Sequence, residues 1–415
     1  ILATYPDVRV FNLSFSNHQP LNEMADVPRR ERLRLMRDLD NFIFANDVIV
    51  VAAAGNSDSG FQPAKPYPDH IDEPGWRLGS WTAGFNVHVC GSFVKDLHPN
   101  GLVQRIGWPS PFTRVGPGIA NSPVPDFSAP GGNWNSQYNF APGLGVISMN
   151  PQGMWEDRSG TSLAVPILAR EAAKTLHHLQ QYVCQSGSRP FGVTVRAFLT
   201  LTAESSTSDV QVKELAARTL GYGVASVLRL RQPKADSAVV IWQGEMNGPK
   251  DLVRVNIPVP HVWLHLCDEP RLRLVACWDT PVNDAVSGLW ACRAVRVHLR
   301  PGPDAKAIRP VRGPSHPSYP VLDRTYKLNS MQSTPISGDN WLVDLSYDEI
   351  AEYFAPMDFT PSQRIGLAIE LFDAGESQAS PQPALQAMSN VQTMTHLSQI
   401  ATPVRQPVVI RAQTE

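Results

Sequence analysis

The first part of the chain alternates between an amphipathic helical pattern and short, uniformly apolar runs. From Asp26, which suits a helix N-cap, apolar side chains recur at helical spacing, with Pro28 in the first turn. These apolar positions are Leu33, Met36, Leu39, Phe42 and Ile43. The run Val48–Ala54 follows directly and ends at Gly55, as expected of a strand buried on both faces. A helix that leads into a buried strand predicts an α/β unit built on a parallel sheet with helices on both faces.

The same alternation predicts further elements downstream. We expect strands at 86–93 and 145–149, and a helix from Ser162 to about Tyr182. Residues 57–80 are rich in Pro and Asp and have no period, which predicts a surface loop. Segments 199–203 and 220–228 are expected to close this unit.

After about residue 231 the pattern changes to short alternating strands separated by Pro and Gly, which predicts an antiparallel β-sandwich. The expected strands are 238–242, 252–258, 272–278, 291–299, 341–346 and 365–372, with 408–410 as an edge strand and 301–320 as a loop. The resulting domains are an α/β domain over 1–232, a sandwich over 233–375 and a loosely patterned tail over 376–415.

The strongest chemical signal is a serine in the heptapeptide Gly160–Pro166, Gly-Thr-Ser-Leu-Ala-Val-Pro. Small residues around Ser162 let a turn run into a helix, which places its hydroxyl and backbone N–H at a helix N-terminus. Asn56 follows the predicted strand Val48–Ala54, and its amide can donate a hydrogen bond to an oxyanion. Such a donor pair stabilises the tetrahedral intermediate of acyl transfer, with a single donor worth about 3 kcal/mol.

Four segments in order resemble the subtilase family of serine peptidases. Gly160–Pro166 is similar to the nucleophile signature, and Ala52–Asn56 resembles the oxyanion-hole strand. Val8–Ser16 resembles the strand that pairs with substrate, and Pro125–Gly131 resembles the loop that precedes the serine. A single short motif is weak evidence, but four in the family's order are specific, and together they cover residues 1 to about 230.

The resemblance implies a serine endopeptidase acting on an extended polypeptide. Ser162 would be the nucleophile, with Asn56 and the Ser162 N–H forming the oxyanion hole. Substrate would add as a strand against Ser14, Phe15, Ser16 and Asn17, with its P1 side chain near Ala52, Ala53, Ala54 and Gly55. Residues 1–232 would then be the C-terminal portion of a subtilisin-like peptidase domain, followed by a jelly-roll-like sandwich.

The acid and base of the family's triad have no match in this chain. They lie upstream of the strand that begins here at Val8, and Asp7 and His18 fall in the wrong places for those roles. We therefore expect the catalytic Asp and His on an upstream N-terminal segment, and the chain, which starts at Ile1, to be inactive alone.

Two other functions stay open at the level of sequence. One is a catalytically dead, subtilase-like binding or scaffold module, and the other is an esterase or transpeptidase that uses the same serine. Ile167 and Arg170 replace the family's usual His and Gly, and Arg170 suggests repacking or a partner surface. This variant resembles bacterial cytosolic subtilases encoded beside AAA-type ATPases, which would make such an ATPase a partner.

Composition adds exclusions. The net charge is −2 with 18% charged residues, which argues against a nucleic-acid partner, and no apolar run is long enough to span a membrane. The five cysteines are widely spaced and predict reduced thiols and a cytoplasmic location, with Cys267 and Cys277 the only pair worth testing for a bridge.

No metal site or cofactor is predicted, and the sequence leaves structural calcium open. His177 and His178 point to different faces of a helix, and the spacing of His261 and His265 does not suit a shared metal on a strand.

Overall fold

The computed structural model divides the chain into two compact units. It describes residues 2, 4–16, 19–20, 26–58, 60, 62–79, 81–182, 189–209, 213–227, 237–249, 251–283, 290–303, 305–311, 319–328, 340–350, 362–375 and 408–410. The first unit comprises Ile1–Lys174, Ala203–Ser226 and Thr280–Ala291, and the second comprises Thr175–Thr202, Val227–Asp279 and Cys292–Glu415. The predicted boundary at residue 232 lies outside the described residues and stays a prediction.

A four-stranded parallel sheet in the order β1-β2-β3-β4 forms the centre of the first unit. Its strands are β1 (Val10–Leu13), β2 (Ile49–Ala53), β3 (His88–Phe93) and β4 (Phe127–Pro130). Every residue of β2 and β3 is buried, which requires cover on both faces of the sheet. The predicted α/β architecture is therefore confirmed, and the apolar run at 48–54 is indeed its central strand.

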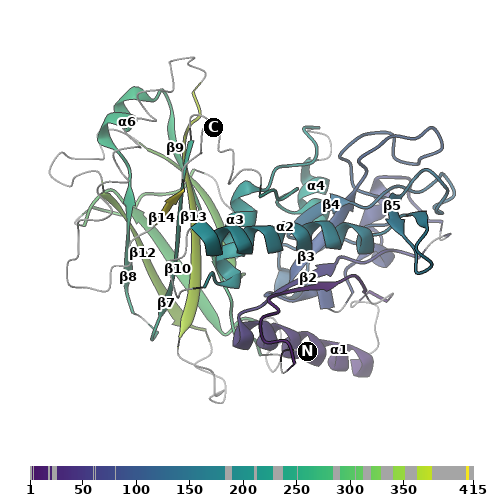
Figure 1. The fold of residues 1–415 in the computed structure, drawn as a ribbon, viewed down its shortest axis with the longest axis horizontal. Helices are drawn as coiled ribbons and strands as arrows, with labels where there is room; N and C mark the ends of the chain where they lie inside the picture. The colour runs from purple at the N-terminus through teal and green to yellow at the C-terminus, as the bar shows by residue number, and fades with distance from the viewer. Residues whose placement is uncertain are drawn as a thin grey trace. The chain divides into compact units, whose positions relative to one another are not determined.

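Helices provide this cover (Figure 1). They are α1 (Asp26–Asn46), α2 (Thr161–Tyr182) and α4 (Lys213–Leu220), with short 3₁₀ helices η2 (Asp69–Asp72), η3 (Pro74–Trp76), η4 (Trp81–Ala83) and η5 (Ile119–Asn121). The predicted apolar face of α1 is largely confirmed, since Met36 and Ile43 are buried, although Phe42 is 38% exposed. From Thr175 onward α2 belongs to the second unit.

Two segments of the first unit have partners that the sequence did not indicate. The strand expected at 145–149 exists as β5 (Val146–Met149), but it pairs only with β6 (Trp155–Arg158) in an antiparallel hairpin and not with the parallel sheet. The segment 125–131, which resembles the loop before the serine, contains β4, because its backbone completes the ladder along β3. Short strands are decided by such partners more than by their own composition.

The segment 57–80 is also more than a surface loop. It contains η2 and η3, and it buries Ile71 and Trp76 in a cluster with Val115. A stretch without periodicity can still bury side chains when distant residues cover it, so the prediction of a solvated loop is wrong at these positions.

The second unit is a sandwich of two antiparallel sheets, as predicted. The sheets have the orders β10-β12-β8 and β11-β9-β13-β7-β14 and share one apolar core. The strands are β7 (Ser237–Met246), β8 (Val253–Pro258), β9 (Pro270–Trp278), β10 (Arg293–Arg300), β11 (Val321–Lys327), β12 (Asn340–Glu349), β13 (Gln363–Asp373) and β14 (Val408–Ile410). Strand β11 was not predicted from the sequence.

Two helices accompany the sandwich. Helix α3 (Gly192–Thr202) is buried along its whole length and packs on the sheet that contains β13. A Cβ at Gly366 of β13 would lie 2.5 Å from the Cα of Thr194, so the close approach of helix and strand requires glycine there. The short helix α6 (His261–Leu266) was not predicted.

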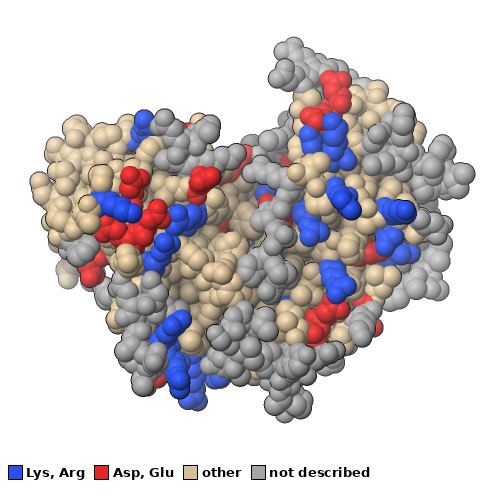
Figure 2. Space-filling model, turned by 180° about the vertical axis from the view of Figure 1, so that it is seen from behind, with Lys and Arg blue, Asp and Glu red and all other residues tan. Residues whose placement is uncertain are grey.

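Figure 2 shows basic and acidic side chains in several local groups on a face that is otherwise mostly uncharged. Many of them are paired, as in the contacts of Arg254 and Arg300 with Asp344 on neighbouring strands. No helix among the residues that the structure describes is both long enough and apolar enough to cross a membrane.

Candidate active site

Ser162 lies at the second position of α2, directly after the turn at Gly160. The turn is held to the end of β4, since the N–H of Gly160 donates to the carbonyl of Gly131 at 2.8 Å. The N–H groups of a first helical turn have no carbonyl partner within their own helix, so the Ser162 N–H belongs to a set of donors that can serve a ligand. Ser162 is half-buried, which leaves its hydroxyl within reach of a substrate.

Asn56 stands three residues after β2 and faces the same turn. Its Oδ1 accepts hydrogen bonds from both the N–H and the Oγ1 hydroxyl of Thr161, each at 2.9 Å. Because both donors require an oxygen acceptor, they also fix which end of the amide is oxygen. The Nδ2 group of Asn56 is therefore left to face the same space as the Ser162 hydroxyl.

The space beside Gly160 is lined by the Ser162 hydroxyl and two N–H donors. A Cβ built on Gly160 would lie 3.1 Å from Asn56 Nδ2, 3.1 Å from Ser162 Oγ and 3.8 Å from the Ser162 N. Glycine leaves this point open. One small atom placed near it is surrounded by a hydroxyl and two N–H donors, which is the arrangement that an oxyanion next to an attacking serine needs.

A neighbouring stretch at Phe112–Val115 supports Asn56 from behind. Asn56 and Thr113 form an isolated antiparallel bridge, and the N–H of Ser57 donates to Phe112 O at 2.9 Å. Arg114 adds two bonds, from its N–H to Gly55 O at 3.1 Å and from its Nε to Asn56 O at 3.0 Å. Sequence reasoning missed Arg114, since no local pattern connects it with a residue nearly sixty positions upstream.

Three buried hydroxyl side chains, Ser92, Ser110 and Thr113, connect β3 with the segment that follows β4. The Ser92 and Ser110 hydroxyls lie 2.7 Å apart, and Ser110 Oγ donates to Gly132 O at 2.6 Å. Thr113 Oγ1 accepts from the Ser92 N–H at 3.1 Å. All three hydroxyl side chains are fully buried, so they anchor the strand that leads to Gly131.

The residues expected to bind substrate lie in two segments. Ser14, Phe15 and Ser16 follow β1; Phe15 is 57% exposed, whereas Asn17 and His18 lie outside the described residues. Ala52–Ala54 are buried, so their side chains belong to the core. A Cβ on Gly55 would lie 2.6 Å from Ser16 Oγ, which places the two segments side by side. Their role in binding substrate stays a prediction.

Within the described part of the chain, no imidazole or carboxylate hydrogen-bonds to Ser162. Asp7 is exposed. His70 is buried, and its Nε2 lies 2.9 Å from the carbonyl of Pro111. The described residues thus bring a hydroxyl and two N–H donors together, and none of them is a base hydrogen-bonded to the serine.

Asp126 lies inside the fold, just before β4. It is fully buried, and its Oδ2 accepts the N–H of Val89 at 2.9 Å, so it ties β3 to the start of β4. Arg170 projects to the surface with 61% of its side chain exposed and pairs with Glu171 at 2.8 Å. This accounts for an arginine at a position where the family usually has glycine.

The described cysteines are free, including Cys267 and Cys277, so no bridge joins that pair. Burial raises the pKa of Cys90 far above its ordinary value, and it raises the pKa of Cys292 to about 11. Thiols in this state are poor nucleophiles.

His261 and His265 lie on helix α6 and not on a strand, with their Nε2 atoms 3.1 Å apart. The premise of strand spacing was wrong. No group of three or more metal-ligating side chains occurs among the residues that the structure describes.

Comparisons with known proteins identify the family and several relatives of this chain. The model of the subtilase family matches residues 3–223. The chain is also similar to the uncharacterized protein y4bN of Sinorhizobium fredii, with 27% identity over 276 residues, which are 59% of this chain and 62% of that protein. The chain thus spans about three fifths of the length of this curated relative.

Solved structures of proteases resemble the chain more distantly. A lanthipeptide protease has a TM-score of 0.38 and 21% identity, covering 55% of this chain and 62% of its own. The self-cleaved protease domain of PatA has a TM-score of 0.33 and 22% identity, with the same two coverages of 55% and 62%.

Proposed function

Since this chain belongs to the subtilase family, we propose that it contains the nucleophile half of a serine endopeptidase. The observation that carries the proposal is the open point beside Gly160, which lies within 3.1 Å of both Ser162 Oγ and Asn56 Nδ2. A serine that only caps a helix does not require an open space beside its hydroxyl, nor a side-chain amide such as that of Asn56 on the other side of that space.

In this proposal Ser162 Oγ attacks the carbonyl carbon of the scissile peptide bond. The C–O bond forms, the carbonyl π electrons move onto oxygen, and the oxyanion accepts hydrogen bonds from Asn56 Nδ2 and the Ser162 N–H. The serine proton passes to a histidine base, which then gives it to the leaving amine as the C–N bond breaks. Water then attacks the acyl carbon and gives a proton to the histidine. The histidine returns this proton to Ser162 Oγ as the ester C–O bond breaks, which releases the second product as an acid.

The histidine and its orienting aspartate are proposed to come from an upstream segment of the same protease. Without them Ser162 has no described base, and a serine hydroxyl alone is a weak nucleophile. The chain by itself is therefore expected to be inactive or nearly so.

The substrate proposed is an extended polypeptide that pairs with the backbone after β1. Ser14–Asn17 would provide the pairing edge, with P1 next to Ala52–Gly55. The proximity of Ser16 to Gly55 supports a shared binding surface of these two segments.

The remaining parts of the chain receive roles only by resemblance. The sandwich, 233–375 in our division, would support the peptidase domain or engage a partner, and an AAA-type ATPase in the bacterial cytoplasm is the partner that the resemblance suggests. Purification of the full-length protease from its own cells tests this: co-purification of the ATPase supports the partnership, and its absence argues against it.

Labelling with a fluorophosphonate probe tests the function. The chain is incubated alone and with the upstream segment, and the adduct is mapped by peptide mass spectrometry. We expect an adduct at Ser162 only when the segment is present, and none in Ser162→Ala, while Ser205→Ala, which removes an exposed serine of the same unit, is labelled normally. No adduct in either preparation would favour the non-catalytic binding module. Labelling combined with hydrolysis of esters but not of peptides would favour the esterase or transpeptidase.

A further inference from the structure

A buried arginine lies directly behind the candidate oxyanion site. Only 1% of Arg114 is exposed, which is unusual for a side chain that carries a permanent charge. A charged group is retained at such depth only when hydrogen bonds offset its desolvation. The hydrogen bonds of Arg114 therefore indicate its role in this part of the fold.

We propose that Arg114 is a positioning residue of the oxyanion site, which acts on catalysis through Asn56. The inference rests on the proposed function, because it assigns a role within that site. Arg114 itself does not touch the reacting atoms; it holds the backbone from which the Asn56 amide projects.

Two hydrogen bonds of Arg114 reach two consecutive residues. Its Nε donates to Asn56 O at 3.0 Å and its N–H donates to Gly55 O at 3.1 Å. The stem also packs against Gly55, since a Cβ built there would lie 3.1 Å from Arg114 Cδ. Gly55 has φ +98°, so the chain turns sharply at this point and has little regular structure of its own to hold it.

Asn56 is thereby held at both ends. Thr161 fixes the side-chain Oδ1 with two bonds of 2.9 Å, and Arg114 fixes the main-chain oxygen with a charge-assisted bond. If only the side-chain Oδ1 were anchored, the Asn56 backbone could shift, and the Nδ2 group would change its position relative to Ser162. Because misplacement of a catalytic group by about 1 Å can cost roughly 100-fold in rate, the second anchor matters to the chemistry.

The second unit contains a buried arginine that serves as a matched comparison. Arg196 of α3 is 2% exposed, and its guanidinium donates to the Tyr319 hydroxyl at 2.8 Å. Arg196 belongs to the other compact unit, so Arg196→Met is the control for the general cost of losing a buried arginine.

A double-mutant cycle tests the inference in the preparation that the probe labels at Ser162. Arg114→Met is made in the wild type and in Asn56→Leu, and kcat and KM for a peptide substrate are measured per labelled site. We expect Arg114→Met to lower kcat about 10-fold or more with little change in KM in the wild type, and by no more than about 2-fold in Asn56→Leu. Arg114→Lys, which keeps a donor and the charge, should restore part of the loss.

Amide hydrogen exchange provides a readout that needs no activity. In the chain as it stands, Arg114→Met should raise the exchange rates of the Gly55 and Thr161 amides about 10-fold, because both amides depend on the position of Asn56 and its neighbours. Arg196→Met can change exchange rates within the second unit, but it should leave the exchange rates of the Gly55 and Thr161 amides at their wild-type values.

Equal losses of kcat in both backgrounds would overturn the inference, since Arg114 would then act on folding alone. Unchanged exchange at Gly55 and Thr161 in Arg114→Met would overturn it as well. If Asn56→Leu has no effect on kcat, or Ser162→Ala remains active, the proposed function itself fails, and the exchange data then decide separately whether Arg114 positions Asn56.

Discussion

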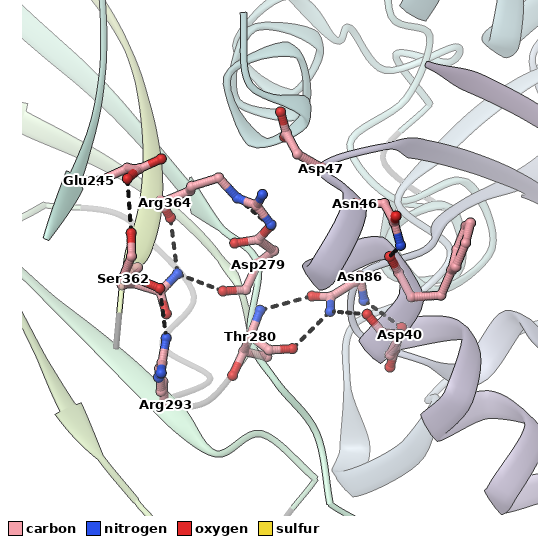
Figure 3. A network of polar contacts seen from close by, with 12 residues as sticks. Asp40, Asn46, Asp47, Asn86, Glu245, Asp279, Thr280, Arg293, Ser362 and Arg364 are labelled. Atoms are coloured by element: carbon pink, nitrogen blue, oxygen red, sulfur yellow. Dashed lines mark hydrogen bonds and ion pairs between the residues drawn. The ribbon is translucent and has the colours of Figure 1, made fainter. Parts of the chain in front are cut away.

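The carboxylate of Asp40, in the middle of α1, accepts a hydrogen bond of 2.7 Å from the indole nitrogen of Trp290, 250 positions later in the chain. The same carboxylate accepts the backbone N–H groups of Phe85 and Asn86 at 2.8 and 2.9 Å. The Asn86 side chain in turn bonds to the backbone of Thr280 in both directions, as Figure 3 shows. These bonds explain why Thr280–Ala291 belongs to the first compact unit although strands of the sandwich precede and follow it.

Asp40→Asn should destabilise the first unit. Asp40 is fully buried and accepts three bonds from N–H donors, and an amide would place its own donor against one of them. We expect the free energy of unfolding to fall by about 3 kcal/mol, measured by urea denaturation. Asp38→Asn on the exposed side of the same helix is the control, and an equal effect of the two substitutions would show that the buried network adds nothing.

Gly160→Ala should abolish most catalysis, and it also strains the turn before α2, since Gly160 has φ +158°. The added methyl would occupy the point that lies 3.1 Å from both Asn56 Nδ2 and Ser162 Oγ, so it competes with the oxyanion for the same space. We expect kcat to fall by a factor of about 100 or more in the active preparation. Gly75→Ala, where the methyl would meet no atom within 4 Å, should behave as wild type. Full activity of Gly160→Ala would place the oxyanion elsewhere.

Thr161→Val should weaken both the fold and the site. The substitution keeps the shape but removes the hydroxyl that donates to Asn56 Oδ1 at 2.9 Å and accepts the Gly55 N–H at 3.2 Å. The free energy of unfolding should fall by about 1 to 2 kcal/mol, since the Gly55 N–H loses its acceptor. Thr161→Ser, which keeps the hydroxyl, should recover most of the stability and of kcat. A Val variant as active as wild type would mean that the Thr161 N–H alone orients the amide.

Acid should destabilise the first unit through His70. Burial lowers the pKa of His70 below its ordinary value of 6.5, against the opposing effects of the Pro111 carbonyl and of Glu73 and Asp69. As the pH falls below about 6.5, the unfolded chain takes up a proton at this histidine while the folded protein stays neutral. Stability is therefore full above that pH and is lost toward the lower pKa of the folded state, by at most about 1.4 kcal/mol per pH unit.

Urea denaturation of wild type and His70→Gln from about pH 7.5 to about pH 5 measures this contribution. The variant should be less stable at neutral pH, because the site between Tyr67, Trp76 and Tyr138 fits an imidazole ring, but its stability should depend less on pH. His177→Gln, which replaces an exposed histidine, is the control. The same pH dependence in wild type and His70→Gln would assign the effect of acid to other groups.

Much of the architecture could be predicted from local patterns. The run at 48–54 and the helical spacing of Met36 and Ile43 each encode their own element, because burial on two faces or on one stripe leaves a period in the sequence. Ser162 and Asn56 could be singled out for the same reason, since the turn before α2 and the end of β2 each have a short local signature.

Other features could not be predicted, because the contacts that decide them join distant residues. The sequence Phe127–Pro130 has little strand character, yet it is a strand because β3 offers it a parallel edge. His261 and His265 were judged by strand spacing, although the backbone there forms a helical turn.

By itself, then, the sequence singled out the residues proposed to carry the chemistry and determined most of the segments that form the central sheet and the sandwich, since both depend on local periodicity and short motifs. Only the tertiary structure decided how the Asn56 amide is oriented, that Arg114 stands behind it, and that Trp290 reaches back to Asp40. The physical reason is that a hydrogen bond to a buried polar group depends on the positions of both partners in space. When the partners are far apart in the chain, no local sequence pattern indicates that they will meet.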